Sequence, residues 1–302
     1  MPSPLPFNLL VLLGPTASGK TALAVEAALQ LQGEIISADS RQVYRGMDIG
    51  TGKDLNEYGA IPYHMIDILN PDQPFNLFEF QSRFNMLFPD ILSRNRLPCL
   101  VGGTGLYVEA VLMGYPLKEA PSNPERRQEL ERLDLEALQK LLLSHQPSLH
   151  NRTDLLEKKY LIRAIEIQES PLPPLPAPTL AIKPIVFGLR FDKTTLKQRI
   201  TNRLRHRMAQ GLIQEVEQLL AQGYSHATLE AFGLEYRFVS QYVRGALHNR
   251  NDLFQKLNSA IHQYAKRQLT WFARMERHGI VIHWLDGEKK PLAQLLHIID
   301  RI

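Results

Sequence analysis

The octapeptide GPTASGKT, Gly14 to Thr21, constrains this chain of 302 residues more than any other feature. It matches the pattern G-x-x-x-x-G-K-[ST] at every fixed position, follows the apolar run Phe7–Leu13 and precedes the helical pattern Thr21–Gln32. A strand, a glycine-rich loop and a helix in this order form a phosphate-binding loop, whose backbone N–H groups face phosphate oxygens. The sequence therefore predicts a polyphosphate site beside a strand.

Each residue of this loop is a candidate ligand of the phosphates. The predicted set is Gly14, Pro15, Thr16, Ala17, Ser18, Gly19, Lys20 and Thr21. Lys20 can reach the terminal phosphates, and the hydroxyl of Thr21 can hold Mg²⁺. The pattern does not identify the polyphosphate, and a nucleotide such as ATP is one candidate.

Composition excludes several classes of protein. Hydrophobic residues make up 44% and charged residues 22% of the chain, which is typical of a soluble globular protein. No apolar run approaches the roughly 20 residues that span a bilayer. The N-terminus lacks the pattern of a signal peptide, and the only cysteine, Cys99, lies in an apolar run and forms no internal disulfide. We therefore expect a cytoplasmic protein without a membrane segment.

Apolar runs and helical patterns alternate in the first third of the chain. Glu34–Ala38 and Pro98–Val101 are predicted strands, and Leu77–Leu92 is a predicted helix between them. This order favours an α/β fold with a parallel sheet flanked by helices, like that of P-loop NTPases. Ligands of such sheets bind at the carboxyl ends of the strands. Three segments should therefore meet in one crevice: the P-loop, Asp39–Gln42 and Gly102–Tyr107.

The middle of the chain has weak strand signals and reads as helical. We expect an all-helical insertion over residues 118–183, within a P-loop core of residues 1–117 and 184–302. Further expected elements are helices over Pro124–Leu143, Asp154–Gln168, Thr194–Gln222 and Asp252–Arg277, a proline-rich linker over Pro171–Pro178, and strands over Pro184–Phe191 and Ile280–Leu285.

Basic residues gather in two places, although the net charge is only +4. Six lie between Lys193 and Arg207 with no acid after Asp192, and Lys266, Arg267, Arg274 and Arg277 follow on a later helix. Such clusters suit phosphates. Solvated helix faces would account for them equally well on charge alone.

Asp39 follows the second predicted strand directly and should face the phosphate crevice. A carboxylate there can orient a metal ion or act as a general base on an incoming nucleophile. The alternative is a structural role, with Asp39 or Ser40 capping the N-terminus of a helix.

Seven segments together resemble one family, the bacterial tRNA dimethylallyltransferases (tRNA isopentenyltransferases). They are GPTASGKT (14–21), DSRQVYRGMDIGT (39–51), IPYHMIDILNP (61–71), LPCLVGGTGLYVEA (97–110), IRAIEI (162–167), GLIQEVEQLL (211–220) and YAKRQLTWF (264–272). They stand in the family's order and span nearly the whole chain. The P-loop alone is widespread, whereas DS-x-QVY-x-GMDIGT and AKRQ-x-TWF are specific.

The resemblance implies transfer of a dimethylallyl group from dimethylallyl diphosphate to the exocyclic amine of the adenosine 3′ of a tRNA anticodon, with Mg²⁺. Asp39 would be the general base, Thr104 would bind the base or the diphosphate, and Lys20 would neutralise the leaving group. The acceptor must leave its stack, and Gln42 and Tyr44 are candidates to contact it. The helical insertion would grip the anticodon stem-loop. The implied tRNA contacts are Asp39, Ser40, Arg41, Gln42, Thr104, Arg127, Ile162, Arg163, Ala164, Ile165, Glu166 and Arg237.

The chain departs from the family's pattern in three places. FGLEYR (232–237) stands where G-Y-[KR]-[EQ] is usual, so Glu235 occupies the slot of a basic residue, which Arg237 could replace. The segment 151–167 is longer than usual. GTGK (50–53) replaces GTAK. None of these departures touches the P-loop, Asp39 or Thr104.

Three other functions are compatible with parts of the sequence. An adenylate isopentenyltransferase would prenylate free AMP, ADP or ATP, a P-loop kinase would transfer a phosphoryl group, and a tRNA-binding module would catalyse nothing. The insertion, the basic clusters and AKRQLTWF favour tRNA as the acceptor. We expect a monomer, because the sequence has no sustained heptad or large apolar stripe.

Overall fold

The computed structural model describes residues 5–121, 123–145 and 157–302, and it divides the chain into two compact units. The core unit comprises Met1–Met113 and Pro178–Ile302, and the helical unit comprises Gly114–Ala177. The sequence placed these boundaries at 118 and 183. Each unit is described by itself below.

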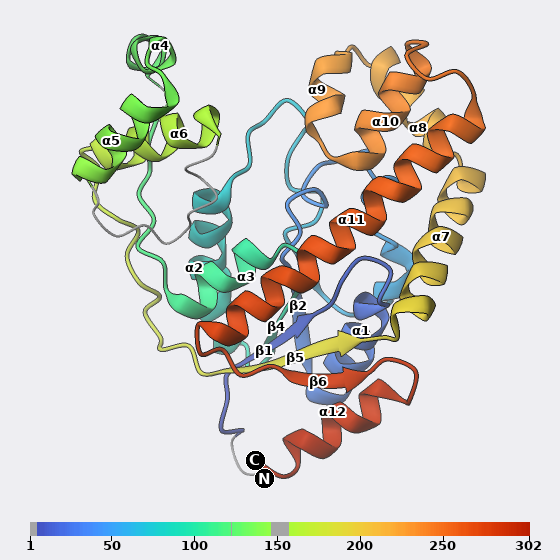
Figure 1. Cartoon of the computed structure of the whole chain (residues 1–302). Helices are drawn as coiled ribbons and strands as arrows, with labels where there is room; N and C mark the ends of the chain where they lie inside the picture. Colours follow the sequence, from blue (N-terminus) through green and yellow to red (C-terminus); the bar gives the residue numbers. More distant parts are fainter. Residues whose placement is uncertain (1–4, 122, 146–156) are drawn as a thin grey trace. The chain divides into compact units, whose positions relative to one another are not determined.

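The core unit is built on one sheet of six strands, all paired in parallel. The strands are β1 (Leu9–Leu13), β2 (Gly33–Ser37), β3 (Tyr63–His64), β4 (Leu97–Gly102), β5 (Pro184–Arg190) and β6 (His283–Asp286). Their order is β3-β2-β4-β1-β5-β6, which places β1 between β4 and β5 (Figure 1). The predicted α/β fold with a parallel sheet is confirmed.

Helices cover both faces of this sheet. Alternate residues of β1 lie on opposite faces of the sheet, because successive side chains of a strand point in opposite directions. Leu10 and Leu12 pack with α1 (Lys20–Leu31) and α12 (Pro291–Ile299). Leu9, Val11 and Leu13 pack with three further helices, α2 (Leu77–Ser93), α3 (Gly105–Met113) and the end of α11 (Arg250–Arg277). Every residue of β1 is therefore buried, as expected of a central parallel strand.

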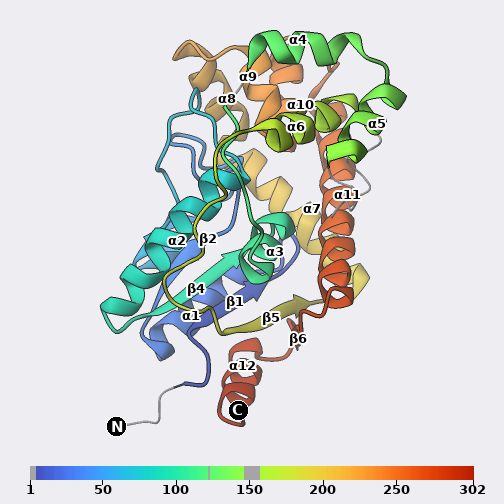
Figure 2. The ribbon, with the colours of Figure 1, turned by 90° about the vertical axis from the view of Figure 1, so that its left-hand side faces the viewer.

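A second, mainly helical core contains α7 and α11, which lie side by side (Figures 1 and 2). Its helices are α7 (Lys193–Gln210), α8 (Leu212–Ala221), α9 (His226–Ala231), α10 (Leu234–Val243) and the first half of α11. Residues from the loop after β2, among them Val43, Tyr44 and Met47, are buried in the same core. This core therefore fixes the loop that follows Asp39.

Two predicted helices are each interrupted. The expected helix Thr194–Gln222 breaks at Gly211, whose φ of 105° is in the left-handed region that favours glycine. The expected helix Pro124–Leu143 breaks at Leu133, which is extended, and the side chain of Asp134 accepts a hydrogen bond from the Ala137 N–H at 2.8 Å. That contact caps the next helix. The last strand also begins later than predicted, at His283.

The described part of the helical unit contains α4 (Pro124–Arg132), α5 (Leu135–His145) and α6 (Lys158–Glu169). Six apolar residues form its core: Leu130, Leu138, Leu142, Leu161, Ile162 and Ile165. The predicted start of α6 at Asp154 lies outside the described residues. Pro174, in the proline tract, bridges to Lys118 and belongs to no helix.

Over the described residues, no helix combines the length and the apolar character needed to cross a membrane. This holds for α11 despite its 28 residues, because charged side chains recur along it.

Candidate active site

A cavity of about 220 Å³ lies at the carboxyl ends of β1, β2 and β4. Its walls include Lys20 and Thr21 from the P-loop, Asp39 and Gln42 after β2, and Gly102 after β4. The three strand ends therefore meet in one crevice, as predicted from their order in the sequence. Thr16, Ala17 and Gly19 also line this cavity, whereas Gly14, Pro15 and Ser18 lie in the loop outside its lining.

The P-loop is held in a conformation that suits an anion. Ala17 and Gly19 have φ values of 64° and 80°, and α1 begins directly after Gly19. Left-handed residues alternating with right-handed ones form a concave nest of N–H groups. Two arginines of α7 brace the loop from one side. Arg199 Nε donates to the Ala17 carbonyl at 2.8 Å, and Arg203 donates to the hydroxyl of Thr16.

The crevice brings two buried cations, Lys20 and Arg203, close together, and nearby carboxylates offset their charges only in part. Burial and the nearby Arg203 and Arg207 together lower the pKa of Lys20 to about 8, although the attraction of Asp39 partly offsets them. Burial and Arg207 lower the pKa of Arg203 in the same way. Over the described residues, neither Lys20 nor Arg203 forms an ion pair with a carboxylate. A bound diphosphate would relieve this repulsion.

Asp39 occupies a turn, so the alternative of a helix cap is wrong. Its Oδ1 accepts a hydrogen bond from the Arg41 N–H at 2.8 Å, as in an Asx turn, and no helix follows it. Its Oδ2 has no hydrogen-bond partner among the residues that the structure describes. One oxygen thus fixes the carboxylate, and the other forms no hydrogen bond with the described residues.

A second cavity, of about 370 Å³, adjoins the first. Both are lined by Thr16, Asp39, Thr51, Arg203 and Tyr264. The second cavity is wider and carries aromatic side chains, Phe232 and Tyr236, together with the predicted residues Ser40, Arg41 and Arg237. Asp39 therefore faces a small cationic cavity on one side and a larger, partly aromatic one on the other.

The departure FGLEYR lies on the wall of the larger cavity. Glu235 is 3.4 Å from Arg207 and partly neutralises that buried guanidinium. Arg207 also donates to the Gly50 carbonyl at 3.4 Å. Arg237 is exposed and lies against Phe238. The acid in the family's basic slot thus supports an arginine of the crevice, and Arg237 provides a cation nearby.

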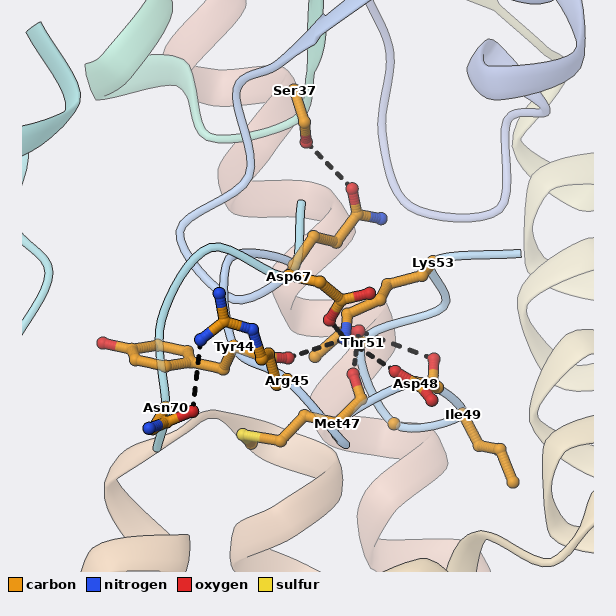
Figure 3. A network of polar contacts seen from close by, with 12 residues as sticks. Ser37, Tyr44, Arg45, Met47, Asp48, Ile49, Thr51, Lys53, Asp67 and Asn70 are labelled. Carbon is orange, nitrogen blue, oxygen red and sulfur yellow. Dashed lines mark hydrogen bonds and ion pairs between the residues drawn. The ribbon is translucent and has the colours of Figure 1, made fainter. Parts of the chain in front are cut away.

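A polar network holds the loop DSRQVYRGMDIGTGK in place (Figure 3). The fully buried Lys53 donates to the Tyr44 carbonyl at 2.6 Å, to Asp48 at 2.6 Å and to Asp67. Gln42 accepts from the Ser37 hydroxyl at 2.9 Å and donates to the Gly52 carbonyl at 3.1 Å. Gln42 also lines the small cavity.

Tyr44 does not reach either cavity, contrary to its suggested role. The ring is 3% exposed and packs edge-on against Phe232 at 4.6 Å. It belongs to the second core, which fixes the loop.

The carboxylate of Glu215 clamps the same loop from α8. It accepts hydrogen bonds from three successive N–H groups, those of Asp48, Ile49 and Gly50, at 2.6–2.9 Å, and from the Tyr236 hydroxyl at 2.6 Å. This explains why the segment GLIQEVEQLL accompanies the GMDIGT segment. Sequence reasoning assigned Glu215 no role, because its three backbone partners lie more than 160 residues away.

Thr104 begins the turn into α3 and is half-buried. Its N–H donates to the Ala38 carbonyl at 3.4 Å, which links it to the residue before Asp39. Thr104 is not among the residues that line the two cavities. Its role in binding the base or the diphosphate stays a prediction.

In the helical unit the predicted tRNA contacts are tied to one another. The buried carboxylate of Glu166 accepts two hydrogen bonds from Arg127, each 2.8 Å, and one from Arg163 at 3.1 Å. Ile162 and Ile165 are buried in this unit's own core. Their side chains cannot contact RNA in this arrangement, which leaves the partly exposed Arg127, Arg163 and Ala164.

Two residues of α11 escaped sequence reasoning as members of the site. Tyr264 lines both cavities, and Gln268 lines the small one. Both belong to the segment YAKRQLTWF. Their spacing of four residues, which places them on one helix face, was the signal that could have found them.

The chain matches the family model described as IPP transferase over residues 42–275, and that described as isopentenyl transferase over residues 7–58. It is 58% identical to tRNA dimethylallyltransferase 1 of Geotalea daltonii, over 97% of this chain and 95% of that protein. It is 59% identical to tRNA dimethylallyltransferase 1 of Geotalea uraniireducens, over 97% of both chains. The chain belongs to the tRNA dimethylallyltransferase (IPP transferase) family.

Solved structures agree with the assignment. A full-length tRNA isopentenylpyrophosphate transferase from Bacillus halodurans superposes with a TM-score of 0.71 at 32% identity, covering 97% of this chain and 95% of that chain. A eukaryotic dimethylallyltransferase acting on tRNA has a TM-score of 0.74 at 21% identity, which shows the shared fold. The resemblance inferred from the seven segments is confirmed.

Proposed function

We propose that this protein transfers the dimethylallyl group of dimethylallyl diphosphate to the exocyclic amine of the adenosine 3′ of the anticodon in tRNA. The position of Asp39 carries this proposal. It stands where a cationic cavity suited to a diphosphate meets a larger cavity with aromatic walls. A general base belongs at the junction of a leaving-group site and an acceptor site.

In the proposed step, the amine nitrogen forms a bond to C1 of the allylic group while the bond between C1 and the diphosphate oxygen breaks. The proton of the amine passes to Oδ2 of Asp39, and the electron pair of the broken bond leaves with diphosphate. Lys20, Arg203 and the P-loop N–H groups stabilise the charge that develops on the leaving oxygen. The isopentenyladenosine product and diphosphate balance the reaction.

We also propose Mg²⁺ as a cofactor of the small cavity. Thr21 provides a hydroxyl there, and the diphosphate would provide the further oxygen ligands that Mg²⁺ prefers. Among the described residues, no three His, Cys, Asp or Glu side chains are grouped so that they could hold a metal by themselves. Thr21 would hold the ion together with the diphosphate, and Mg²⁺ would supply charge neutralisation for the leaving group.

For the tRNA, we propose that the larger cavity receives the extruded adenine, with Ser40, Arg41 and Arg237 near its flanking nucleotides. The helical unit would bind the anticodon stem-loop through Arg127 and Arg163. We also propose that the enzyme is monomeric and cytoplasmic, as expected from its sequence. Gel filtration with light scattering would test the monomer.

The proposal is tested by the modified nucleoside itself. The protein, dimethylallyl diphosphate and Mg²⁺ are incubated with a tRNA that has adenosine 3′ of the anticodon, and with the same tRNA carrying guanosine there. Digestion and mass spectrometry should find isopentenyladenosine in the first tRNA alone. A product in neither tRNA, together with phosphoryl transfer from ATP, would instead make this a kinase.

A further inference from the structure

We infer that Gln268 is a positioning residue, which sets the P-loop and the Gly102–Gly103 turn at the spacing that the transfer requires. The inference rests on the proposed function, and it assigns a role to a residue that the mechanism above does not use. Gln268 lies on α11, far along the chain from both loops that it joins.

The side-chain amide of Gln268 bridges the two loops directly. Its Oε1 accepts a hydrogen bond from the Thr16 N–H at 2.8 Å, and its Nε2 donates to the Gly103 carbonyl at 2.9 Å. Gln268 is 6% exposed, so both contacts are shielded from water. Buried hydrogen bonds of this kind fix the relative positions of the groups they join, because breaking one leaves a buried polar group without a partner.

Thr16 is thereby held at two points. Gln268 binds its N–H, and Arg203 binds its hydroxyl. Thr16 lines both cavities, so its orientation affects the diphosphate site and the acceptor site together. Without Gln268, the Thr16 N–H would lose its acceptor, and the P-loop would adopt a wider range of conformations.

On the other side, the bridge holds the turn that leads to Thr104. The Thr104 N–H donates to the Ala38 carbonyl, next to Asp39. A Cβ atom on Gly103 would lie 2.3 Å from Gln268 Nε2, so glycine is needed there for the amide to fit. The leaving-group loop and the strand end that carries the base are thus connected through Gln268.

Misplacing reacting groups by about 1 Å can lower a rate by about 10²-fold. We therefore expect Gln268→Ala to lower kcat by about 10- to 100-fold and the affinity for inorganic diphosphate by about tenfold. The affinity for tRNA should stay within about twofold, because Gln268 lies in the small cavity. Gln255→Ala, an exposed glutamine on the same helix, is the matched control and should behave like the wild type.

A double-mutant cycle with Gly103→Ala separates positioning from folding. Gly103→Ala should displace the amide and reproduce the kinetic defect of Gln268→Ala. The double variant should be little worse than Gln268→Ala alone, since the smaller side chain removes the nearest contact of the new Cβ and leaves the Gly14 carbonyl oxygen at 3.3 Å. Thermal melting of each variant shows that the assays use folded protein.

The outcomes are distinct. Wild-type kcat and wild-type diphosphate affinity in Gln268→Ala, with only a lower melting temperature, would reduce Gln268 to a structural role. Multiplying defects in the double variant would also overturn the inference. If the wild type binds diphosphate but transfers no dimethylallyl group, the proposed function is wrong. The diphosphate affinities of the wild type and of Gln268→Ala would then still test the role of Gln268.

Discussion

Arg203 of the core crevice and the arginines of the helical unit have opposite surroundings. Arg203 donates to the hydroxyl of Thr16 and, among the described residues, forms no ion pair with a carboxylate. Arg126 and Arg127 are instead neutralised by carboxylates, with Arg126 bonded to Glu169 at 2.7 and 2.9 Å and Arg127 to Glu166. In the described part of the chain, Arg203 therefore forms no ion pair that a bound anion would have to replace, whereas Arg126 and Arg127 already bind carboxylates. Counting basic residues in the sequence could not separate these two cases.

The largest expected effect belongs to the base at the junction of the two cavities. Asp39→Asn keeps an oxygen for the Arg41 N–H but cannot accept the proton, so kcat should fall about 10²- to 10⁴-fold. Steady-state kinetics with tRNA and dimethylallyl diphosphate measure it. Binding of tRNA should change little, and an equal loss of tRNA affinity would make Asp39 a recognition residue.

The next effect contrasts the two kinds of arginine. Arg203→Ala should lower kcat/KM for dimethylallyl diphosphate about 10²- to 10³-fold, because an uncompensated donor to the leaving group is lost. Arg127→Ala, in the helical unit, should leave that constant within about twofold. Similar losses in both variants would show that the paired and unpaired arginines do not differ in role.

The lowered pKa of Lys20 makes diphosphate binding sensitive to pH. Lys20 is charged below its pKa of about 8 and loses its proton above it, so affinity for the anion should fall by about tenfold per pH unit above pH 8. Calorimetric titration with inorganic diphosphate from pH 7 to 9.5 measures this fall. Lys20→Arg should flatten the profile, and an unchanged profile would assign the titration to the ligand or another group.

The smallest effects are expected where charges are already paired. Arg127→Ala should weaken tRNA binding a few-fold and reduce the salt dependence of binding by about one phosphate contact. Glu166→Gln should lower the free energy of unfolding by about 1 kcal/mol, discounted because Arg127 and Arg163 are partly exposed. Filter binding at several salt concentrations and urea denaturation measure them. Loss of stability without loss of tRNA binding would make the cluster purely structural.

Local patterns in the sequence were enough for the centre of the fold. Phe7–Leu13 and the P-loop predicted β1 and the start of α1, and strand ends in a parallel sheet then placed Asp39 and Gly102 together. The break at Gly211 was missed because the apolar spacing continues across it, although the glycine itself was the signal.

Contacts between distant residues were out of reach of the sequence. Gln268 meets Thr16 across 252 positions, and Glu215 meets the loop at Asp48 across 167. Neither contact produces a periodic pattern in the sequence. The family resemblance included both segments and marked that of Gln268 as specific, yet only the folded chain shows what they hold.

The most direct test of the account uses one labelled donor and two acceptors. Radiolabelled dimethylallyl diphosphate and Mg²⁺ are given to the protein with unmodified tRNA or with free AMP. Label in tRNA alone is the predicted result, because in the proposed function the larger cavity receives the adenine and the helical unit binds the anticodon stem-loop. Label in AMP but not in tRNA would contradict the account and would identify a free-nucleotide prenyltransferase.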